Sequence, residues 1–368
     1  MYAERLKKLK EGTLAQGLDA VALVPGSNMI YVSGIHSHLS ERPIVLFVPV
    51  DDEPAIIIPM LEATKAADAG IPGHRIYSWS DEEGYTDAFQ NACAQLELSD
   101  VLLGVEALRM RVLELELLRR YAPNLKTAHA DPILNALRLR KDAAELDAIE
   151  RAVAVAEIAM HNLLPQIRLG QTEKEVAAML TRELMSSGAH TLAFEPIVSA
   201  GPNGASPHAV PTDRALQKGD LLILDWGAMV DGYVSDITRT FALSPIAEEL
   251  RQVYEVVRTA NEAGRAATKP GRTGEEIDAA TRAVIDNAGY GDYFIHRTGH
   301  GLGMEAHEDP SIVRGHTSPL PAGAVFTIEP GIYLPGRGGV RIEDNVVITA
   351  DGCHSLTSFP RDLMTIAA

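Results

Sequence analysis

Cysteine is almost absent from this sequence of 368 residues, which contains only Cys93 and Cys353. They lie far apart and lack metal-type spacing, so a disulfide framework is not expected and a reducing compartment is the simpler interpretation. No apolar run is long enough to span a bilayer, and the charged start, residues 1–12, lacks the apolar core of a signal peptide. We therefore expect a cytoplasmic protein with no membrane partner.

Basic residues are also scarce, with 33 Lys and Arg against 50 Asp and Glu and a formal net charge of −17. A nucleic-acid partner is not expected, because phosphate binding needs a concentrated basic face. Hydrophobic residues make up 46% of the chain, which is ordinary for a folded globular protein. The length suits two domains.

Short apolar runs rich in Val and Ile, bounded by turn residues, predict strands in the first part of the chain. Helical patterns lie between the later runs, and this mixture is typical of an α/β domain, which we place at residues 1–135. The predicted strands are 19–25, 29–34, 43–50, 55–60 and 101–106, and the predicted helices are 85–96 and 109–121.

The remaining residues, 136–368, predict a second domain of α+β type. Residues 137–164 form an Ala-rich amphipathic pattern without Gly or Pro and predict one long helix. Thr172 and Glu175 have the spacing of a capping box at the start of another helix. Beyond Leu192 we expect mainly strands and loops, interrupted by helical stretches at 245–267 and 274–288.

Two aspartates in this domain are placed by a predicted hairpin. Four apolar residues, 221–224, lead directly into Asp225, and Asp231-Gly232 is a strong signal for a two-residue turn. With that turn, residue 225 faces residue 238, and Asp236 is a diagonal neighbour of Asp225 on the same face of the sheet. Two buried acids on one face repel unless protons or a cation lie between them. The alternative is that Asp225 caps a turn and Asp236 is solvated.

Three of the 12 histidines, His296, His300 and His307, fall within one segment of twelve residues. The glycines Gly299, Gly301 and Gly303 argue against a helix there, and they suit a backbone that passes close to a ligand. A solvent-exposed loop with incidental histidines is the alternative.

Two glutamates complete the candidate set. Glu329 follows an apolar run and precedes Pro330-Gly331, and Glu343 lies in a strand-like segment. Strand alternation there puts residues 340, 342 and 344 on one face and residues 341, 343 and 345 on the other.

Four carboxylates and one imidazole form an oxygen-rich set whose charge two divalent cations can neutralise. Oxygen ligands favour Mn(II), Co(II) or Fe(II) over a thiolate zinc site. We expect Mn(II) first, with Co(II) or Zn(II) as alternatives. Paired metals of this kind serve hydrolases by ionising a shared water and polarising the attacked carbonyl.

The ordered motifs DWGAMVDGYVSDITRT, HRTGHGLGMEAHEDP, IEPGIY and VRIEDNVVIT resemble the pita-bread metallopeptidases, most closely Xaa-Pro dipeptidases (prolidases) and Xaa-Pro aminopeptidases. The first half resembles the creatinase/prolidase N-terminal domain by pattern. The resemblance implies that Asp225, Asp236, His300, Glu329 and Glu343 hold two metal ions. Asp236 and Glu343 would bridge both ions, Asp225 would bind one, and His300 and Glu329 would bind the other.

The resemblance also implies roles for residues around the metals. His208 and His307 would lie near the scissile carbonyl, and His296 would line the pocket for the proline ring. Glu329 would act as a general acid–base as well as a ligand. Arg341 would steady an acidic ligand. The alternatives are a loop histidine for His208, a structural histidine for His296 and a surface charge for Arg341.

The expected substrate is therefore a proline-containing di- or oligopeptide with a free N-terminus. A dipeptidase needs a cation for the carboxylate of the terminal proline, and we predict Arg42, on a loop with His36 and His38, for this role. Arg42 could instead be an ordinary loop charge or pair with Glu41. The alternatives are an Xaa-Pro aminopeptidase acting on longer peptides and a non-catalytic peptide-binding protein on the same scaffold. The resemblance further implies a homodimer.

Overall fold

The structure is a computed structural model that describes residues 2–366 and divides into two compact units, Met1–Leu137 and Arg138–Ala368. The sequence-based boundary lies after residue 135. Residue 1 and residues 367–368, at the outer ends of the two predicted domains, lie outside the described residues. Between residues 2 and 366 no helix is both long and apolar enough to cross a membrane.

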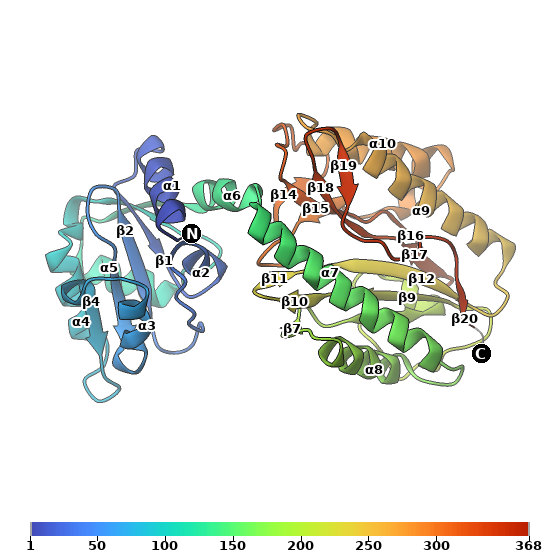
Figure 1. Ribbon diagram of the computed structural model, residues 1–368, viewed down its shortest axis with the longest axis horizontal. Helices are drawn as coiled ribbons and strands as arrows, with labels where there is room; N and C mark the ends of the chain where they lie inside the picture. The colour runs from blue at the N-terminus through green and yellow to red at the C-terminus, as the bar shows by residue number, and fades with distance from the viewer. Residues whose placement is uncertain (1, 367–368) are drawn as a thin grey trace. The chain divides into compact units, whose positions relative to one another are not determined.

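The first unit is built on one six-stranded sheet with the order β4-β3-β2-β1-β5-β6 (Figure 1). Strands β1, β2 and β3 pair antiparallel, and the pairs β3–β4, β1–β5 and β5–β6 are parallel. The strands are β1 Ala20–Leu23, β2 Val45–Pro49, β3 Ala55–Pro59, β4 Ile76–Trp79, β5 Leu102–Val105 and β6 Lys126–His129. The helices are α1 Tyr2–Ala15, α2 Ser27–Ser33, α3 Ala63–Asp68, α4 Thr86–Gln95, α5 Val112–Tyr121 and α6 Asp131–Leu139, which ends in the second unit.

Most predicted elements of this unit are confirmed, but the strand predicted at 29–34 is wrong, because the segment is helix α2. Apolar runs this short fit a buried helix as well as a strand. The backbone decides between them at Gly34, which has a φ of 74° and donates its N–H to the Ile30 carbonyl at 2.8 Å. A left-handed glycine of this kind is a common helix terminator.

The second unit carries four long helices around several small sheets (Figure 1). The main sheets have the orders β20-β12-β9-β8 and β14-β13-β15-β18-β19, joined by the three-stranded sheet β11-β10-β7 and the hairpin β16–β17. The helices are α7 Ala143–Leu163, α8 Glu173–Ser186, α9 Glu248–Ala267 and α10 Gly274–Asn287. The strands are β7 Thr191–Leu192, β8 Ile197–Ala200, β9 Leu221–Trp226, β10 Ala228–Val230, β11 Tyr233–Val234, β12 Ile237–Leu243, β13 Gly299–Gly301, β14 Glu308–Ile312, β15 Val325–Ile328, β16 Gly331–Leu334, β17 Gly338–Arg341, β18 Asp344–Ile348, β19 Cys353–Ser355 and β20 Thr365–Ile366.

The four helices form two pairs, α7 with α8 and α9 with α10, that lie on different sides of the strands (Figure 1). Apolar residues of α7 and α8 share one buried core with β8, β9 and β12. A second core joins α9 to β16 and β17. The strands are therefore covered by helices, and polar side chains on them are removed from bulk water.

The single long helix predicted at 137–164 is interrupted in the structure. Helix α6 ends at Leu139, and α7 begins after Asp142, whose carboxylate accepts the Glu145 N–H at 2.9 Å. Glu145 accepts the Asp142 N–H at 2.8 Å in return, which completes a capping box. The backbone of Asp142 is extended, so a helix cannot continue through it. Its side chain instead caps α7 by accepting a backbone N–H of the first turn. The capping box predicted for Thr172 and Glu175 is confirmed at the start of α8.

The hairpin predicted around Asp231-Gly232 is also confirmed. Asp231 and Gly232 have φ angles of 51° and 80°, and strands β9 and β12 pair with Asp225 opposite Thr238. Strands β10 and β11 next to the turn keep the same register, with Met229 opposite Val234, although Gly227 and residues 235–236 interrupt the strands. The shared register puts Asp236 on the same face as Asp225.

Gly299 and Gly301 are required for strand packing, and the predicted close approach of a ligand to this backbone stays a prediction. A Cβ on Gly299 would lie 1.8 Å from the carbonyl oxygen of Thr327 in β15. A Cβ on Gly301 would lie 2.1 Å from the carbonyl oxygen of Asp309. The glycines bring the backbone carrying His300 against its neighbours.

The close approach at Gly299 leads to a stability prediction. We expect Gly299→Ala to destabilise the second unit by about 3 kcal/mol, because backbone atoms must move to admit the methyl group. The chain has two tryptophans, Trp79 and Trp226, so urea denaturation in a Trp79→Phe background reports the second unit through Trp226 fluorescence.

The matched control is Gly352→Ala, in the same unit, where an added Cβ would meet no atom within 4 Å. Equal denaturation midpoints for the two variants would contradict this account of Gly299.

Candidate metal centre

Asp225 and Asp236 reach the site from one β-hairpin. Asp225 lies near the end of β9 and Asp236 directly precedes β12, and both side chains are buried. Asn345 holds the backbone at Asp236: its side chain accepts the Asp236 N–H at 3.0 Å and donates to the Asp236 carbonyl. The hairpin register and this clamp fix where the two carboxylates point.

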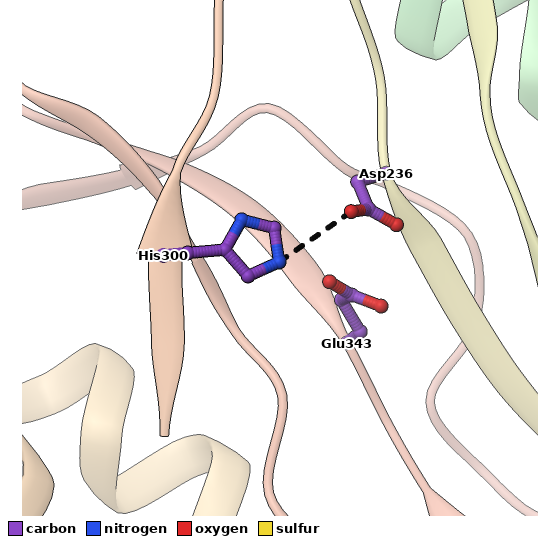
Figure 2. Close-up of side chains that lie close together, drawn as sticks. All are labelled: Asp236, His300 and Glu343. Carbon is purple, nitrogen blue, oxygen red and sulfur yellow. Dashed lines mark ion pairs between the residues drawn. The ribbon is translucent and has the colours of Figure 1, made fainter. Parts of the chain in front are cut away.

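His300 lies in β13, Glu329 directly follows β15 and Glu343 directly precedes β18, and these three strands belong to one sheet. Figure 2 shows His300 facing Asp236 and Glu343, and the ligand atoms of these three residues lie within 4.8 Å of one another. His300 Nε2 is 3.6 Å from Asp236 Oδ2 and 3.3 Å from Glu329 Oε1. His300 Nδ1 is 3.2 Å from the carbonyl of Gly301, to which it donates, so Nε2 is free to act as a ligand.

Almost all the site residues predicted from the sequence line one cavity of about 830 Å³. Its lining includes Asp225, Asp236, His300, Glu329 and Glu343, together with His208, His296, His307 and Arg341. Arg42, the remaining predicted site residue, lies in the first unit.

The buried acids are poorly accommodated as anions. Burial, and then the neighbouring carboxylates, raise the pKa of Asp236 and of Glu343 well above the usual range. Burial also raises the pKa of Glu329 to about 8. Such shifts indicate that nearby negative charge is not balanced by the protein's own cations.

Two carboxylate oxygens in the cluster have no hydrogen-bond partner among the described residues. They are Asp225 Oδ1 and Glu343 Oε1, both buried. Buried polar atoms are normally satisfied, and an ionised carboxylate oxygen can only accept a hydrogen bond or bind a cation. Burial lowers the pKa of His300 well below its usual value, so the imidazole is neutral, as a metal ligand must be. The donor set therefore fits divalent cations.

Arg341 orients two of these acids. Its Nη2 donates to Asp225 Oδ2 at 2.6 Å, and its Nε donates to Thr238 Oγ1 at 3.1 Å. The Thr238 hydroxyl in turn donates to Glu343 Oε2 at 2.6 Å. The alternative that Arg341 is a surface charge is wrong, because the residue is 3% exposed. Thr238 was missed by the sequence analysis, although the predicted register places it opposite Asp225.

A second chain of hydrogen bonds leads from Arg341 to His296. Arg341 Nη1 donates to the Tyr333 hydroxyl at 2.8 Å, which lies 2.9 Å from His296 Nε2. His296 Nδ1 lies 2.8 Å from the Arg297 carbonyl, which can only accept, so Nε2 accepts from Tyr333. Burial and then the Arg341 charge lower the pKa of His296 to about 4, which keeps the ring neutral. Nothing in the sequence distinguished Tyr333.

His307 and Arg297 lie on the same side of the cluster. The His307 ring meets the His300 ring edge to face, with centroids 4.2 Å apart. Partial burial and then Arg297 lower the pKa of His307. Arg297 lines the cavity, and its side chain makes one hydrogen bond, to Ser311 Oγ at 3.4 Å, and no ion pair among the described residues. The sequence analysis missed Arg297, which stands between His296 and His300.

Arg42 is held by acids of its own unit. Its Nε and Nη2 donate to Asp81 at 2.9 and 2.8 Å, and its Nη1 donates to Glu41 at 2.9 Å. The predicted loop carries it, between α2 and β2.

Comparison with known proteins identifies both halves of the chain. Residues 147–350 match the model of metallopeptidase family M24, and residues 5–140 match the creatinase/prolidase N-terminal domain. An Xaa-Pro dipeptidase of Lactobacillus helveticus is 36% identical, over 98% of each chain. The crystal structure of a prolidase from Thermococcus sibiricus is 35% identical with a TM-score of 0.94, covering 99% of each chain. That of the dipeptidase PepE from Mycobacterium ulcerans is 36% identical with a TM-score of 0.92, covering 99% of this chain and 98% of the other. The predicted fold classes of both domains are confirmed.

The carboxylate cluster yields a prediction on metal binding. With Mn²⁺ at a hundredfold excess over its Kd we expect a gain of about 2.7 kcal/mol in the folded protein, or roughly 5–10 °C in Tm. Asp236→Asn is expected to lose most of this gain. Without metal, the variant is expected to melt at or above the wild-type temperature, because one buried negative charge is gone.

Thermal denaturation with and without Mn²⁺ measures both effects. Asp231→Asn is the control, since Asp231 is exposed at the hairpin turn, where asparagine is equally suited. A full Mn²⁺ shift in Asp236→Asn would contradict the assignment.

Proposed function

This chain belongs to metallopeptidase family M24, and on that premise we propose that it is a dinuclear-metal dipeptidase that hydrolyses Xaa-Pro dipeptides with a free N-terminus. The similarity to an Xaa-Pro dipeptidase and to a prolidase along nearly the whole chain supports this substrate. The observation that carries the proposal is the buried cluster of carboxylates around His300, with two oxygens that lack a partner.

Asp225, Asp236, His300, Glu329 and Glu343 would hold the two cations. When bound, such cations supply an ionised water as nucleophile and polarise the attacked carbonyl. The protein's own part is to orient the ligands, which Arg341 does for Asp225 directly and for Glu343 through Thr238.

The other cavity residues act on the substrate. An Xaa-Pro bond has no N–H and carries the proline ring on its nitrogen. The site therefore needs a pocket without charge for this ring, and the neutral imidazole of His296 lines it. His208 and His307 stabilise the negative charge that develops on the carbonyl oxygen. A carboxylate oxygen of Glu329 holds a proton and passes it to the departing proline nitrogen.

The free carboxylate of the terminal proline needs a cation. We propose Arg42 for this role, as the sequence analysis predicts, although its guanidinium would have to exchange Asp81 and Glu41 for the substrate. Arg297 is the second candidate, because it lines the cavity and has no acidic partner among the described residues.

Finer properties are proposals as well. Mn(II) is the first metal to test, because oxygen donors dominate the site. A homodimer is proposed from the family resemblance. A cytoplasmic location is supported by the free state of Cys93 and Cys353.

His307→Ala is expected to keep the metals and lose about 10²–10³ in kcat, the usual cost of removing one preorganised partner of the oxyanion. Metal content after gel filtration and the rate of proline release from Ala-Pro measure the two properties. His354→Ala, an exposed histidine of the same unit, is the control. Near-normal turnover in His307→Ala would remove the assigned role.

Substrate length provides the test of the function and of the carboxylate clamp. We expect chelator-sensitive hydrolysis of Ala-Pro and much slower hydrolysis of Ala-Pro-Ala. Substituting the true clamp by alanine is expected to lower kcat/KM for Ala-Pro by about 10–100-fold, the value of a charge-assisted hydrogen bond of 1.5–3 kcal/mol. The tripeptide should be affected much less.

Arg42→Ala and Arg297→Ala are compared in this assay, with Arg297→Lys to separate the charge from the forked geometry. An unchanged length preference in both alanine variants would defeat the clamp. An enzyme that prefers Ala-Pro-Ala is an aminopeptidase, and a protein without activity on either is a binding protein.

A further inference from the structure

Glu173 is a buried carboxylate that lies outside the metal cluster and is held by hydrogen bonds. It is the first residue of α8 and is 0% exposed. Among the described residues it forms no ion pair. Instead its oxygens accept four hydrogen bonds: from Ala200 N at 2.7 Å, Asn203 Nδ2 at 2.7 Å, Thr212 N at 2.9 Å and Thr212 Oγ1 at 2.6 Å. Its place at the start of a 14-residue helix favours a negative charge further.

All four donors lie in the segment 200–212, here called the loop 200–212, which begins at Ala200, the last residue of β8, and carries His208. Ala200 and Asn203 lie at the start of the loop and Thr212 at its end, so a single carboxylate joins both ends. Asn203 also donates to the Val210 carbonyl at 3.3 Å, which closes the loop on itself.

The middle of the loop is tied to the metal cluster. Arg341 Nη1 donates to the Pro207 carbonyl at 3.0 Å, next to His208. The imidazole of His208 lines the cavity, yet no hydrogen bond, ion pair or ring contact holds it among the described residues. Where His208 points therefore depends on the backbone beneath it, and the backbone depends on Glu173 and Arg341.

We propose that Glu173 is a positioning residue, which fixes the loop 200–212 so that His208 faces the attacked carbonyl oxygen. The proposal rests on the function proposed above. A loosened loop would cost catalysis, because a displacement of about 1 Å can lower a rate by about 10²-fold.

Glu173→Gln tests the proposal with almost no change of shape. Glutamine has one acceptor oxygen and one NH₂ group, and the NH₂ must face an N–H or O–H donor of the loop, since all four contacts of Glu173 are with donors. We expect kcat for Ala-Pro to fall by about 10–100-fold, with little change in Mn²⁺ content. Glu175→Gln is the matched control, because it makes the same change two residues further along and glutamine serves equally in a capping box.

A double-mutant cycle with His208→Ala separates positioning from a general structural effect. In the His208→Ala background, Glu173→Gln is expected to lower kcat by less than about threefold, because the group it positions is already gone. Losses that multiply would overturn the proposal, and so would wild-type kcat in Glu173→Gln alone.

Thr212→Val removes one donor from the loop and leaves α8 untouched, and it keeps the proposal testable if Glu173→Gln fails to fold. The same cycle with His208→Ala is expected to be non-additive, and wild-type kcat in Thr212→Val would then overturn the proposal. Failure of the proposed function has a different signature, since the wild-type protein itself would then release no proline from Ala-Pro.

Discussion

Mutual repulsion among four carboxylates, gathered around one imidazole inside the second unit, is the constraint on which the rest of the site depends. Burial and like charges together raise the pKa of Asp236 and Glu343, so the ionised cluster is unfavourable by itself. One oxygen each of Asp225 and Glu343 has no hydrogen-bond donor among the described residues that could relieve this repulsion. Asp225, Asp236, His300, Glu329 and Glu343 would hold divalent cations that supply the missing positive charge, as expected of a chain in metallopeptidase family M24.

Two neighbouring acids show how strand alternation separates function from stability. Glu343 points to the cavity, where its pKa is raised, and Asp344 points to the opposite face. Burial opposes ionisation of Asp344 too, but Arg239 and Arg361 lie 2.8 and 2.7 Å from it and lower its pKa. Adjacent residues on opposite faces of a strand can therefore differ in role: one carboxylate is suited to bind metal cations, and the other forms ion pairs inside the protein.

Orientation in this site comes largely from side chains that do not themselves touch metal or substrate. Thr238 relays the hold of Arg341 to Glu343, and Asn345 clamps the backbone at Asp236. The Tyr333 hydroxyl donates to Nε2 of the neutral His296 ring and so orients it. Glu173 orients a whole loop, whereas these residues orient single side chains. These contacts are buried or partly buried, and they limit the freedom that the reacting groups would otherwise have.

Local patterns in the sequence determined much of this protein: the hairpin at Asp231-Gly232, the pairing of residue 225 with 238, the alternation at 341–345 and the capping box at Thr172 all depend on neighbours in the chain. They did not determine the helix at 27–33, because a short apolar run fits a helix as well as a strand. Nor did they determine the break before α7, because the extended conformation of one residue, Asp142, does not disturb the helical pattern around it. Only the tertiary structure decided that the backbone of Thr327 leaves no room for a side chain at position 299, and that Glu173 holds the loop with His208. It also decided that Arg42 is paired with an acid, whereas Arg297 in the cavity contacts only Ser311 Oγ among the described residues. These contacts join residues far apart in the chain, and neither helical nor strand periodicity carries information about them.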